Sequence, residues 1–364
     1  MNLLVVFTVS FFITVLITPL VIMLAKKYGL VDDPKNRPHP AHIQKRIIPR
    51  AGGLPVYIAI VITTLIFLPL EKYLVGIFFG ITTLLILGLI DDKRLQFNPY
   101  KRLLLLFAAA GFAVASGVGI SFINNPLASL TFLPSFLTIP IIHLDTLIYS
   151  INLFGEHNLI LIADIFAFFW IITLTQIINW SKGVDGQMPS ITLVTAIILG
   201  LLSMKFYFLG DANQLNIAIL AFIVAGASAG LLIFNWYPSK IIPGFSGSTV
   251  LAYMLAVLAI LSGAKLATAL LVLAIPTIDF IYTFWRRVLT GHSPVWGDRG
   301  HLHHRLLDLG WSHQKISLFY MFGSVILGSV ALAVNTGSKI FAVSIVGVAF
   351  IAFILWLNSF YHRD

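Results

Sequence analysis

Residues 74–90 read Leu-Val-Gly-Ile-Phe-Phe-Gly-Ile-Thr-Thr-Leu-Leu-Ile-Leu-Gly-Leu-Ile and are followed at once by Asp91 and Asp92. Seventeen uncharged residues are enough for an α-helix to cross the hydrocarbon core of a bilayer, which takes about 17–25 residues. Two adjacent carboxylates at the membrane boundary are costly to desolvate unless they bind a cation or a proton donor. We therefore favour a functional role for this pair. The alternative is that Asp91-Asp92-Lys93-Arg94 merely ends a helix and reaches into water.

The same pattern recurs along the whole chain. Of 364 residues, 59% are apolar and 10% are charged, whereas soluble domains have about 45–50% and about 25%. This composition excludes a soluble fold. Runs of spanning length lie near residues 1–25, 52–70, 74–90, 103–120, 160–179, 189–206, 214–234, 247–263, 266–285, 316–334 and 338–358. We expect an all-α integral membrane protein of about eleven transmembrane helices, forming a single polytopic domain over residues 1–364.

Basic residues predict how the helices are oriented. The first apolar run has no basic residue before it and Lys26-Lys27 after it, so we expect a retained span that begins outside rather than a signal peptide. On that topology 19 of the 23 Lys and Arg residues lie on one side, which predicts that this side is cytoplasmic in a multi-pass protein of the cell membrane. The predicted inner loops one to five are about 26–51, 91–102, 180–188, 235–246 and 286–315. Residues 121–159 form a long outer excursion that could hold a short hairpin and shows no chemistry.

The predicted inner side also holds eight of the ten histidines and many of the aspartates, which the sorting of positive charge does not explain. A polar site facing the cytoplasm would explain it. Inner loop one mixes bases, imidazoles and turn formers and continues through Arg50 to Gly53. It is either a solvated basic loop attracted to anionic lipid headgroups or a grip for the phosphates of an anionic substrate. Composition leaves both open.

Inner loops three and four combine glycines with polar residues. In loop three, Asp185 lies on a tight turn and is either a helix N-cap or a site residue, while Asn179 and Lys182 are one helical turn apart and could face a ligand together. Loop four reads Pro243-Gly-Phe-Ser-Gly-Ser-Thr249. Backbone amides in such a loop before a helix can cradle phosphate, although an ordinary turn capped by Ser246 or Ser248 is the favoured interpretation of this loop alone. The loop lacks the lysine of a Walker motif, so an ATPase is not indicated.

Inner loop five carries Arg286-Arg287 and then Trp296-Gly-Asp-Arg-Gly-His-Leu-His-His-Arg305. If residues 300–309 are helical, His301, His304 and Arg305 share a face and His303 points elsewhere. Clustered imidazoles suit zinc, but the nearby arginines oppose a dication and favour a pyrophosphate. We therefore expect an anion-binding cluster.

Taken together, these loops resemble the polyprenyl-phosphate N-acetylhexosamine-1-phosphate transferases, the superfamily of WecA, TagO and MraY. The resemblance covers nearly the whole chain in the right order. The residues that carry it are Val31-Asp32 with Pro49-Arg-Ala-Gly-Gly53, Asp91-Asp92 with Lys101, Asn179 with Asp185-Gly186, Gly244 with Gly247-Ser248, and Asp298-Arg-Gly-His-Leu-His-His304. The His-Leu-His-His form is more similar to the WecA/TagO branch than to MraY.

The resemblance implies that a polyprenyl phosphate attacks the β-phosphorus of a UDP-N-acetylhexosamine, with UDP-N-acetylglucosamine expected as donor, and releases UMP. It implies catalytic roles for Asp91, Asp92 and Asp185. It implies substrate binding by Arg50, Lys101, Asn179, Lys182, Arg299, His301, His303, His304 and Arg305. A phosphate monoester has a second pKa of about 6, so we expect the acidic pair to orient the lipid phosphate rather than to remove its proton.

The resemblance also implies Mg²⁺, for which Asp91, Asp92 and Asp185 are the candidate ligands. Two positions depart from the family pattern, because Lys182 and Phe245 stand where the family usually has aspartates. One hypothesis is that the Lys182 ammonium partly replaces the metal. The other is that the three remaining aspartates and the substrate phosphates still bind it.

Two other functions compete with this interpretation. A catalytically degenerate member would bind lipid-linked sugar or a partner protein without turnover. A secondary transporter is less well supported, because the ionisable residues in mid-membrane are only Asp164 and Asp279, and Asp279 is better placed to support inner loop five. The expected partners are the bilayer, the lipid phosphate and the nucleotide sugar, with no nucleic acid and with a homodimer left open.

Overall fold

The computed structural model describes residues 2–35, 43–44, 46–94, 98–125, 128, 134–135, 138–152, 156–263, 266–293, 298–334 and 336–361. Parts of two loop motifs lie outside this described part, namely residues 36–42 and 45 of inner loop one, with His39, His42 and Lys45, and residues 294–297 of inner loop five, with Trp296. Every candidate catalytic and binding residue named above lies inside it.

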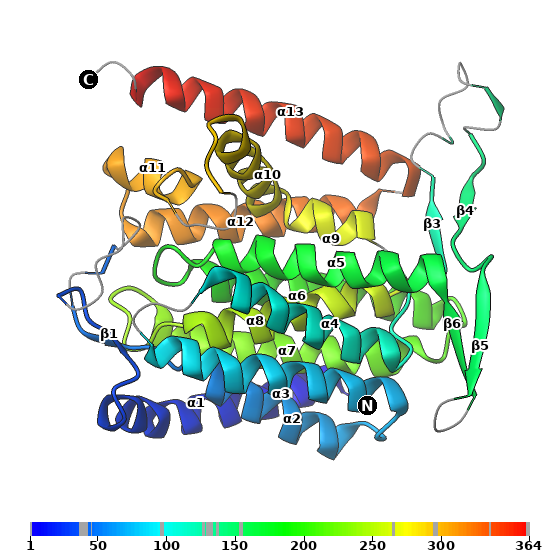
Figure 1. Ribbon diagram of the computed structural model, residues 1–364, viewed down its shortest axis with the longest axis horizontal. Coiled ribbons are helices and arrows are strands. Elements are labelled where there is room, and N and C mark those ends of the chain that lie inside the picture. Colours follow the sequence, from blue (N-terminus) through cyan, green and yellow to red (C-terminus); the bar gives the residue numbers. More distant parts are fainter. Residues whose placement is uncertain are drawn as a thin grey trace.

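Long helices dominate the described chain (Figure 1). They are α1 (Leu3–Lys27), α2 (Gly53–Phe67), α3 (Lys72–Lys93), α4 (Pro99–Ala115), α5 (Leu161–Trp180), α6 (Gln187–Phe208), α7 (Gln214–Asn235), α8 (Gly244–Leu261), α9 (Leu266–Val272), α10 (Ala274–Leu289), α11 (Leu302–Asp308), α12 (His313–Ala333) and α13 (Thr336–Tyr361). Each predicted spanning run coincides with a helix, except that the run at 266–285 is divided between α9 and α10, which are bent by 85°. The prediction of one continuous helix there is wrong. Pro276 explains the break, because it has no amide to bond back to the preceding turn.

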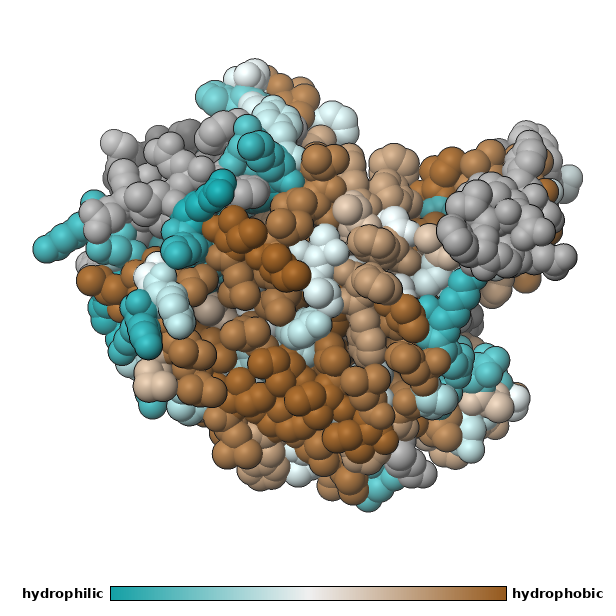
Figure 2. Space-filling view, turned by 60° about the horizontal axis from the view of Figure 1, so that its bottom comes forward, coloured by the Kyte–Doolittle hydropathy of each residue, from teal (hydrophilic) through white to brown (hydrophobic). Residues whose placement is uncertain are grey.

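The described helices confirm the expected class, an all-α integral membrane protein. Seven of them are long and apolar enough to cross a membrane, and the bent pair α9–α10 would make eight. Two shorter apolar helices are α2 and residues 341–356. Figure 2 shows a broad apolar band on the surface with polar residues toward its ends. The count of eleven spans stays a prediction.

Short antiparallel strand pairs lie between the helices. They are β1 (Val31–Asp32) with β2 (Ile48–Pro49), β3 (Phe122–Asn124) with β4 (Ile141–His143), and β5 (Ile148–Asn152) with β6 (Glu156–Ile160). The first pair closes inner loop one and places Val31 opposite Pro49. The other two pairs form the predicted outer excursion and confirm the hairpin expected there. In Figure 1 they lie at the opposite end of the bundle from β1 and α11.

Helix α8 lies in the centre of the bundle, and its residues from Gly244 to Ile260 are all buried. Glycines let its first turn approach two neighbours closely, because a Cβ on Gly53 of α2 or on Gly88 of α3 would collide with Ser246. Small residues have this role in membrane proteins, where close van der Waals packing rather than the hydrophobic effect holds helices together. The end of α3, with Asp91 and Asp92, is thereby placed beside the start of α8.

Candidate active site

Inner loops one and four lie side by side. Arg50 forms a parallel bridge with Ile242, and the Gly52 amide donates to the Ile242 carbonyl at 3.2 Å. In Figure 1, β1, α11 and the turn between α5 and α6 all lie at this same end of the bundle. Loops that are far apart in sequence therefore share one polar end.

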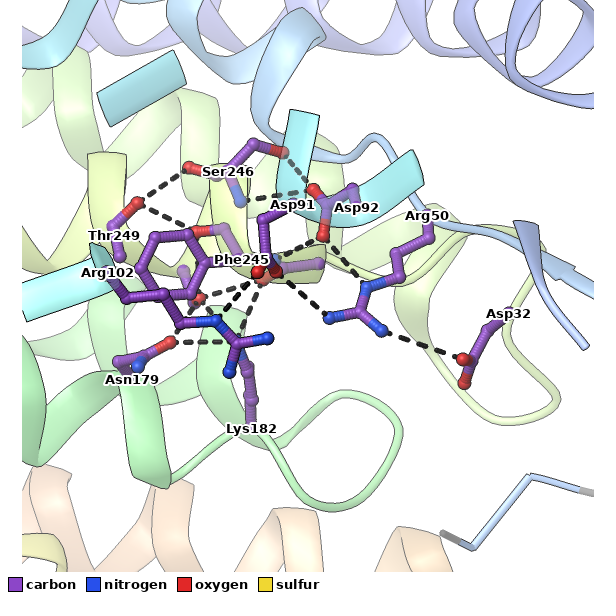
Figure 3. A network of polar contacts seen from close by, with 12 residues as sticks. Asp32, Arg50, Asp91, Asp92, Arg102, Asn179, Lys182, Phe245, Ser246 and Thr249 are labelled. Atoms are coloured by element: carbon purple, nitrogen blue, oxygen red, sulfur yellow. Dashed lines mark hydrogen bonds and ion pairs between the residues drawn. The ribbon is translucent and has the colours of Figure 1, made fainter. Parts of the chain in front are cut away.

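Asp92 is bound to the first turn of α8 (Figure 3). Its Oδ1 accepts a hydrogen bond from the Phe245 amide at 2.7 Å, and its Oδ2 accepts from the Ser246 amide at 3.1 Å and the Ser246 hydroxyl at 2.7 Å. A carboxylate is favoured here because the first amides of a helix lack partners within the helix and carry partial positive charge. Gly244 has a φ of +69°, and a Cβ on it would collide with the Asp92 carboxylate. Glycine has no Cβ and readily adopts a positive φ, so it avoids both the backbone strain and the collision.

These contacts test the two interpretations of inner loop four, a phosphate-binding loop and a turn capped by a serine. The phosphate cradle predicted before α8 is already used by Asp92. The serine cap is also wrong, because the Ser248 hydroxyl donates to the Gly244 carbonyl at 2.7 Å while the N-cap residue Pro243 makes no side-chain hydrogen bond. The sequence predicts where α8 begins but not that a carboxylate from α3 caps it.

Arg50 bridges three carboxylates. Its Nε lies 2.8 Å from Asp92 Oδ1, and its two terminal nitrogens lie 3.7 Å from Asp91 Oδ2 and 3.6 Å from Asp32 Oδ1. Burial alone would lower the pKa of Arg50, but Asp92 and then the other two carboxylates raise it above its ordinary value. Arg50, predicted as a substrate ligand, is thus a permanently charged part of the acidic cluster.

Asp91 is paired with Arg102 of α4, with Nε 2.7 Å from Oδ1. Asp91 and Asp92 are each only 1% exposed, so the alternative that this pair reaches into water is wrong. Lys101, the predicted phosphate ligand of this loop, is exposed on α4. Its neighbour Arg102 is the residue that reaches the site, and sequence reasoning missed it.

Lys182 lies between inner loops three and four. Its Nζ donates to Asn179 Oδ1 at 2.7 Å, to Ser248 Oγ at 2.9 Å and to the Gly244 carbonyl at 3.2 Å. It also lies 5.3 Å from the ring centroid of Phe245. Asn179 and Lys182 therefore contact each other, and their facing a ligand together stays a prediction. Burial, followed by the charge of the Arg50 guanidinium, lowers the pKa of Lys182 to about 7.

Asp185 has a separate set of partners. It accepts hydrogen bonds from Gln44 Nε2 at 2.6 Å and from the Ser239 amide at 3.0 Å, and His313 Nδ1 lies 4.0 Å away. The N-cap interpretation is wrong, because the N-cap of α6 is Gly186 and makes no side-chain hydrogen bond. Asp185 thus joins inner loops one, three and four.

The histidines of inner loop five are held by α10. His301 Nδ1 lies 3.0 Å from Asp279 Oδ2, and the Leu302 amide donates to Asp279 Oδ1 at 2.7 Å, so the predicted supporting role of Asp279 is confirmed. The ring of His303 is 5.5 Å from that of His301 and 4.4 Å from that of His304. The prediction that His303 points elsewhere is wrong. The helix begins only at Leu302, and His301 is extended, so helical spacing does not apply to it.

Two of these imidazoles lie in surroundings that favour their neutral forms at pH 7. Burial and then the neighbouring rings lower the pKa of His303 well below its ordinary value and that of His304 to about 4. They can therefore offer a phosphate hydrogen bonds but not charge. His303 also contacts inner loop three, because a Cβ on Gly183 would collide with its ring.

The four arginines near α11 have partners within the protein. Arg286 and Arg287 both pair with Asp298, with nitrogen–oxygen distances of 2.6 and 2.9 Å. Arg299 pairs with Asp308 at 3.0 Å, and the guanidinium carbon of Arg305 lies 4.8 Å from the ring centroid of Tyr282. Burial raises the pKa of Asp298, but hydrogen bonds from Arg287 and the Gly300 amide hold it well below its usual range. An anion bound here would have to share Arg286, Arg287 and Arg299 with carboxylates. The anion-binding cluster stays a prediction.

The site residues do not fit a resident Mg²⁺. Within the described residues no three His, Asp or Glu side chains come together as a metal site, so the candidate set Asp91, Asp92 and Asp185 is not gathered around one point. Both oxygens of Asp92 already accept from N–H or O–H donors. Mg²⁺ requires near-octahedral oxygen ligands at about 2.0–2.1 Å. The oxygen atoms of the site instead accept hydrogen bonds from guanidinium and ammonium groups.

Comparison with known proteins agrees with this architecture. The chain is 26% identical over 327 residues to a Bacillus subtilis (strain 168) protein named probable undecaprenyl-phosphate N-acetylglucosaminyl 1-phosphate transferase, covering 88% of this chain and 81% of that protein. It is 27% identical over 345 residues to the decaprenyl-phosphate N-acetylglucosaminephosphotransferase of Mycolicibacterium smegmatis (86% and 78% covered). It is 24% identical over 342 residues to the phospho-N-acetylmuramoyl-pentapeptide-transferase of Clostridium perfringens (strain 13 / Type A) (89% and 96% covered).

These names confirm the resemblance drawn from the loop motifs. Residues 74–263, which run from near the start of α3 to just beyond α8, match the model of glycosyl transferase family 4. The matched part holds Asp91, Asp92, Asn179, Lys182 and Asp185. This match spans more than half of the 364 residues. The chain therefore belongs to glycosyl transferase family 4.

Proposed function

We propose that the protein transfers N-acetylglucosamine-1-phosphate from UDP-N-acetylglucosamine to a polyprenyl phosphate, for the synthesis of a cell-envelope glycan. Family membership supports a transferase of this kind, and the names of the relatives support the two substrates. The observation that carries the proposal is the cluster in which Arg50 and Arg102 pair with two buried carboxylates, with Lys182 nearby, at one polar end of a membrane bundle.

The reaction requires charge neutralisation and alignment. An oxygen of the lipid phosphate attacks the β-phosphorus of the donor, the bond from that phosphorus to the bridging oxygen breaks, and UMP leaves with the bridging oxygen. Both reactants are anions, so cations that hold them in line supply most of the catalysis. The second pKa of a phosphate monoester is about 6, so the nucleophile needs no base at neutral pH. Asp91 and Asp92 are accordingly assigned to holding Arg50 and Arg102 in place.

The remaining polar residues are assigned to the donor. Asn179 in the last turn of α5 and Asp185 in the loop between α5 and α6 would contact the nucleotide. His301, His303 and His304 would donate hydrogen bonds to its diphosphate. We assign no magnesium site to the protein, because its donor set does not fit one. The site is proposed to face the cytoplasm, where nucleotide sugars are made, and the 19 basic residues on the predicted inner side support this orientation.

The test is an assay of purified protein in lipid nanodiscs with polyprenyl phosphate and a panel of UDP-sugars. We expect UMP release that depends on both substrates and is fastest with UDP-N-acetylglucosamine. UMP release without the lipid would indicate a hydrolase, and a faster rate with another UDP-sugar would correct the donor.

A binding protein without turnover is the second candidate function. It is favoured by Lys182 and Phe245, which replace the aspartates expected from the family pattern. Binding of the donor without UMP release in the same nanodiscs would support this role and count against the transferase.

A further inference from the structure

In the Asp91–Asp92 site the positive charges lie nearer the solvent than the two carboxylates do. The side chains of Asp91 and Asp92 are 1% and 0% exposed, whereas those of Arg50 and Arg102 are 16% and 33% exposed. Lys182 is also partly exposed. A molecule that enters from solvent therefore meets cations before it meets carboxylates. Because like charges repel at short range, this order favours an entering anion over an entering metal ion.

Lys182 already fills an oxygen-lined position. Three oxygens, from Asn179, Ser248 and Gly244, surround its Nζ at 2.7, 2.9 and 3.2 Å, and they match the three N–H donors of an ammonium group. These distances are longer than the roughly 2.0–2.1 Å that Mg²⁺ requires, and none of the three oxygens is a carboxylate oxygen. The position is thus built for a monovalent cation that the chain itself supplies.

Phe245 fixes where this charge lies. Its ring centroid is 5.3 Å from Lys182 Nζ and 5.4 Å from the guanidinium carbon of Arg102, so both cations lie close to one aromatic ring. Its own backbone amide donates to Asp92, which holds the ring at the start of α8. The side chain at position 245 therefore positions cations and offers no ligand to a metal.

We propose that the protein works without a resident divalent metal and that the Lys182 ammonium supplies the fixed positive charge in its place, together with Arg50 and Arg102. The inference rests on the proposed function and specifies the chemistry of that same site. A bound phosphate favours the protonated form of Lys182, because an opposite charge nearby stabilises the ammonium group. Lys182 then gives and takes no proton in the bond-forming step. It stabilises the negative charge on the transferred phosphoryl group while the same phosphorus–oxygen bonds form and break.

The first test measures UMP release by the unmodified protein after exhaustive chelation with EDTA, with and without added Mg²⁺. We expect similar rates in both conditions. Loss of activity on chelation with full recovery on addition of Mg²⁺ would overturn the inference.

The second test replaces the charge. Lys182→Met keeps the length of the side chain and should lower kcat by about 10²–10³, whereas Lys182→Arg should recover part of the rate, because it restores a cation. Lys315→Met is the matched control, since Lys315 is exposed at the start of α12 and outside the site. A Lys182→Met protein that turns over at the normal rate would remove Lys182 from the scheme. Should this variant fail to fold, as judged by gel filtration, the chelation test decides alone.

A binding measurement separates this inference from the proposed function. Calorimetry with UDP-N-acetylglucosamine is run in EDTA on the unmodified protein and on Lys182→Met. If no UMP is released under any condition, the transferase proposal fails. The inference is still supported if the unmodified protein binds UDP-N-acetylglucosamine in EDTA and Lys182→Met binds it more weakly. Binding only with Mg²⁺, or none in either condition, would overturn the inference independently of turnover.

Discussion

Asp92 shows how one side chain serves both the fold and the site. Its two oxygens accept from the first amides of α8, from the Ser246 hydroxyl and from Arg50. From the sequence alone the residue suggests a functional role only. The structure adds that the same carboxylate caps a buried helix and neutralises a guanidinium, so its removal should affect stability as well as turnover.

The Asp92→Asn variant tests this dual role. An amide can accept on only one of its two heteroatoms, which leaves a donor of α8 or Arg50 without its acceptor. We expect a loss of about 3–5 kcal/mol in the free energy of unfolding and a fall of about 10²–10³ in kcat. Asp211→Asn, at an exposed turn before α7, is the control in the same melting and UMP-release assays. An unchanged melting temperature in Asp92→Asn would show that its contacts to α8 carry no stability.

We expect His304 to make the stability of the protein depend on pH. Its pKa is lowered to about 4, first by burial and then by His301, whereas an unfolded histidine titrates near 6.5. Between these two values the unfolded chain binds more protons, so the stability falls as the pH falls from about 6.5 toward 4. We expect the melting temperature in detergent to drop over this range and to drop less in His304→Gln. Equal pH dependence in both proteins would exclude His304 as the source.

At the level of helices and loops, the apolar runs were predictable because a spanning helix is encoded by local composition. The contacts between the ends of the helices were not predictable from local composition. The resemblance named Lys101 as a ligand, but Arg102, which points about 100° away from Lys101 on the same helix, is the residue that reaches Asp91. The bend between α9 and α10 was likewise hidden within an apolar run, although Pro276 was a visible signal for it.

Asp279 gives a prediction about how one helix holds another. It is the residue of α10 that holds the start of α11, through His301 and the Leu302 amide. Asp279→Ala should release α11 and raise amide hydrogen exchange in residues 301–309, while exchange in α8 stays the same. Asp279→Asn is the matched variant, because it can still accept from the Leu302 amide, and it should show a smaller increase. Unchanged exchange in both variants would mean that α11 is held by other contacts.

The whole molecule has two chemically different ends. The inner loops with the site residues lie at one end of the bundle, and the strand pairs β3–β4 and β5–β6 lie at the other (Figure 1). The sequence places 19 of 23 basic residues at the first end, so the polar site and the excess of positive charge coincide. If that end faces the cytoplasm, the lipid phosphate must present its headgroup in the inner leaflet.

Cysteine labelling tests this sidedness directly, because the chain has no cysteine of its own. The probes need exposed positions, which excludes the buried Asp91 and His303 and favours Lys315 at the site end and Asp211 at the opposite end. A membrane-impermeant maleimide should label Asp211→Cys in intact cells and should label Lys315→Cys only after the membrane is made leaky. The reverse pattern would place the site outside, where a nucleotide sugar is not supplied, and labelling of both positions in intact cells would show that the two ends do not lie on opposite sides of the membrane.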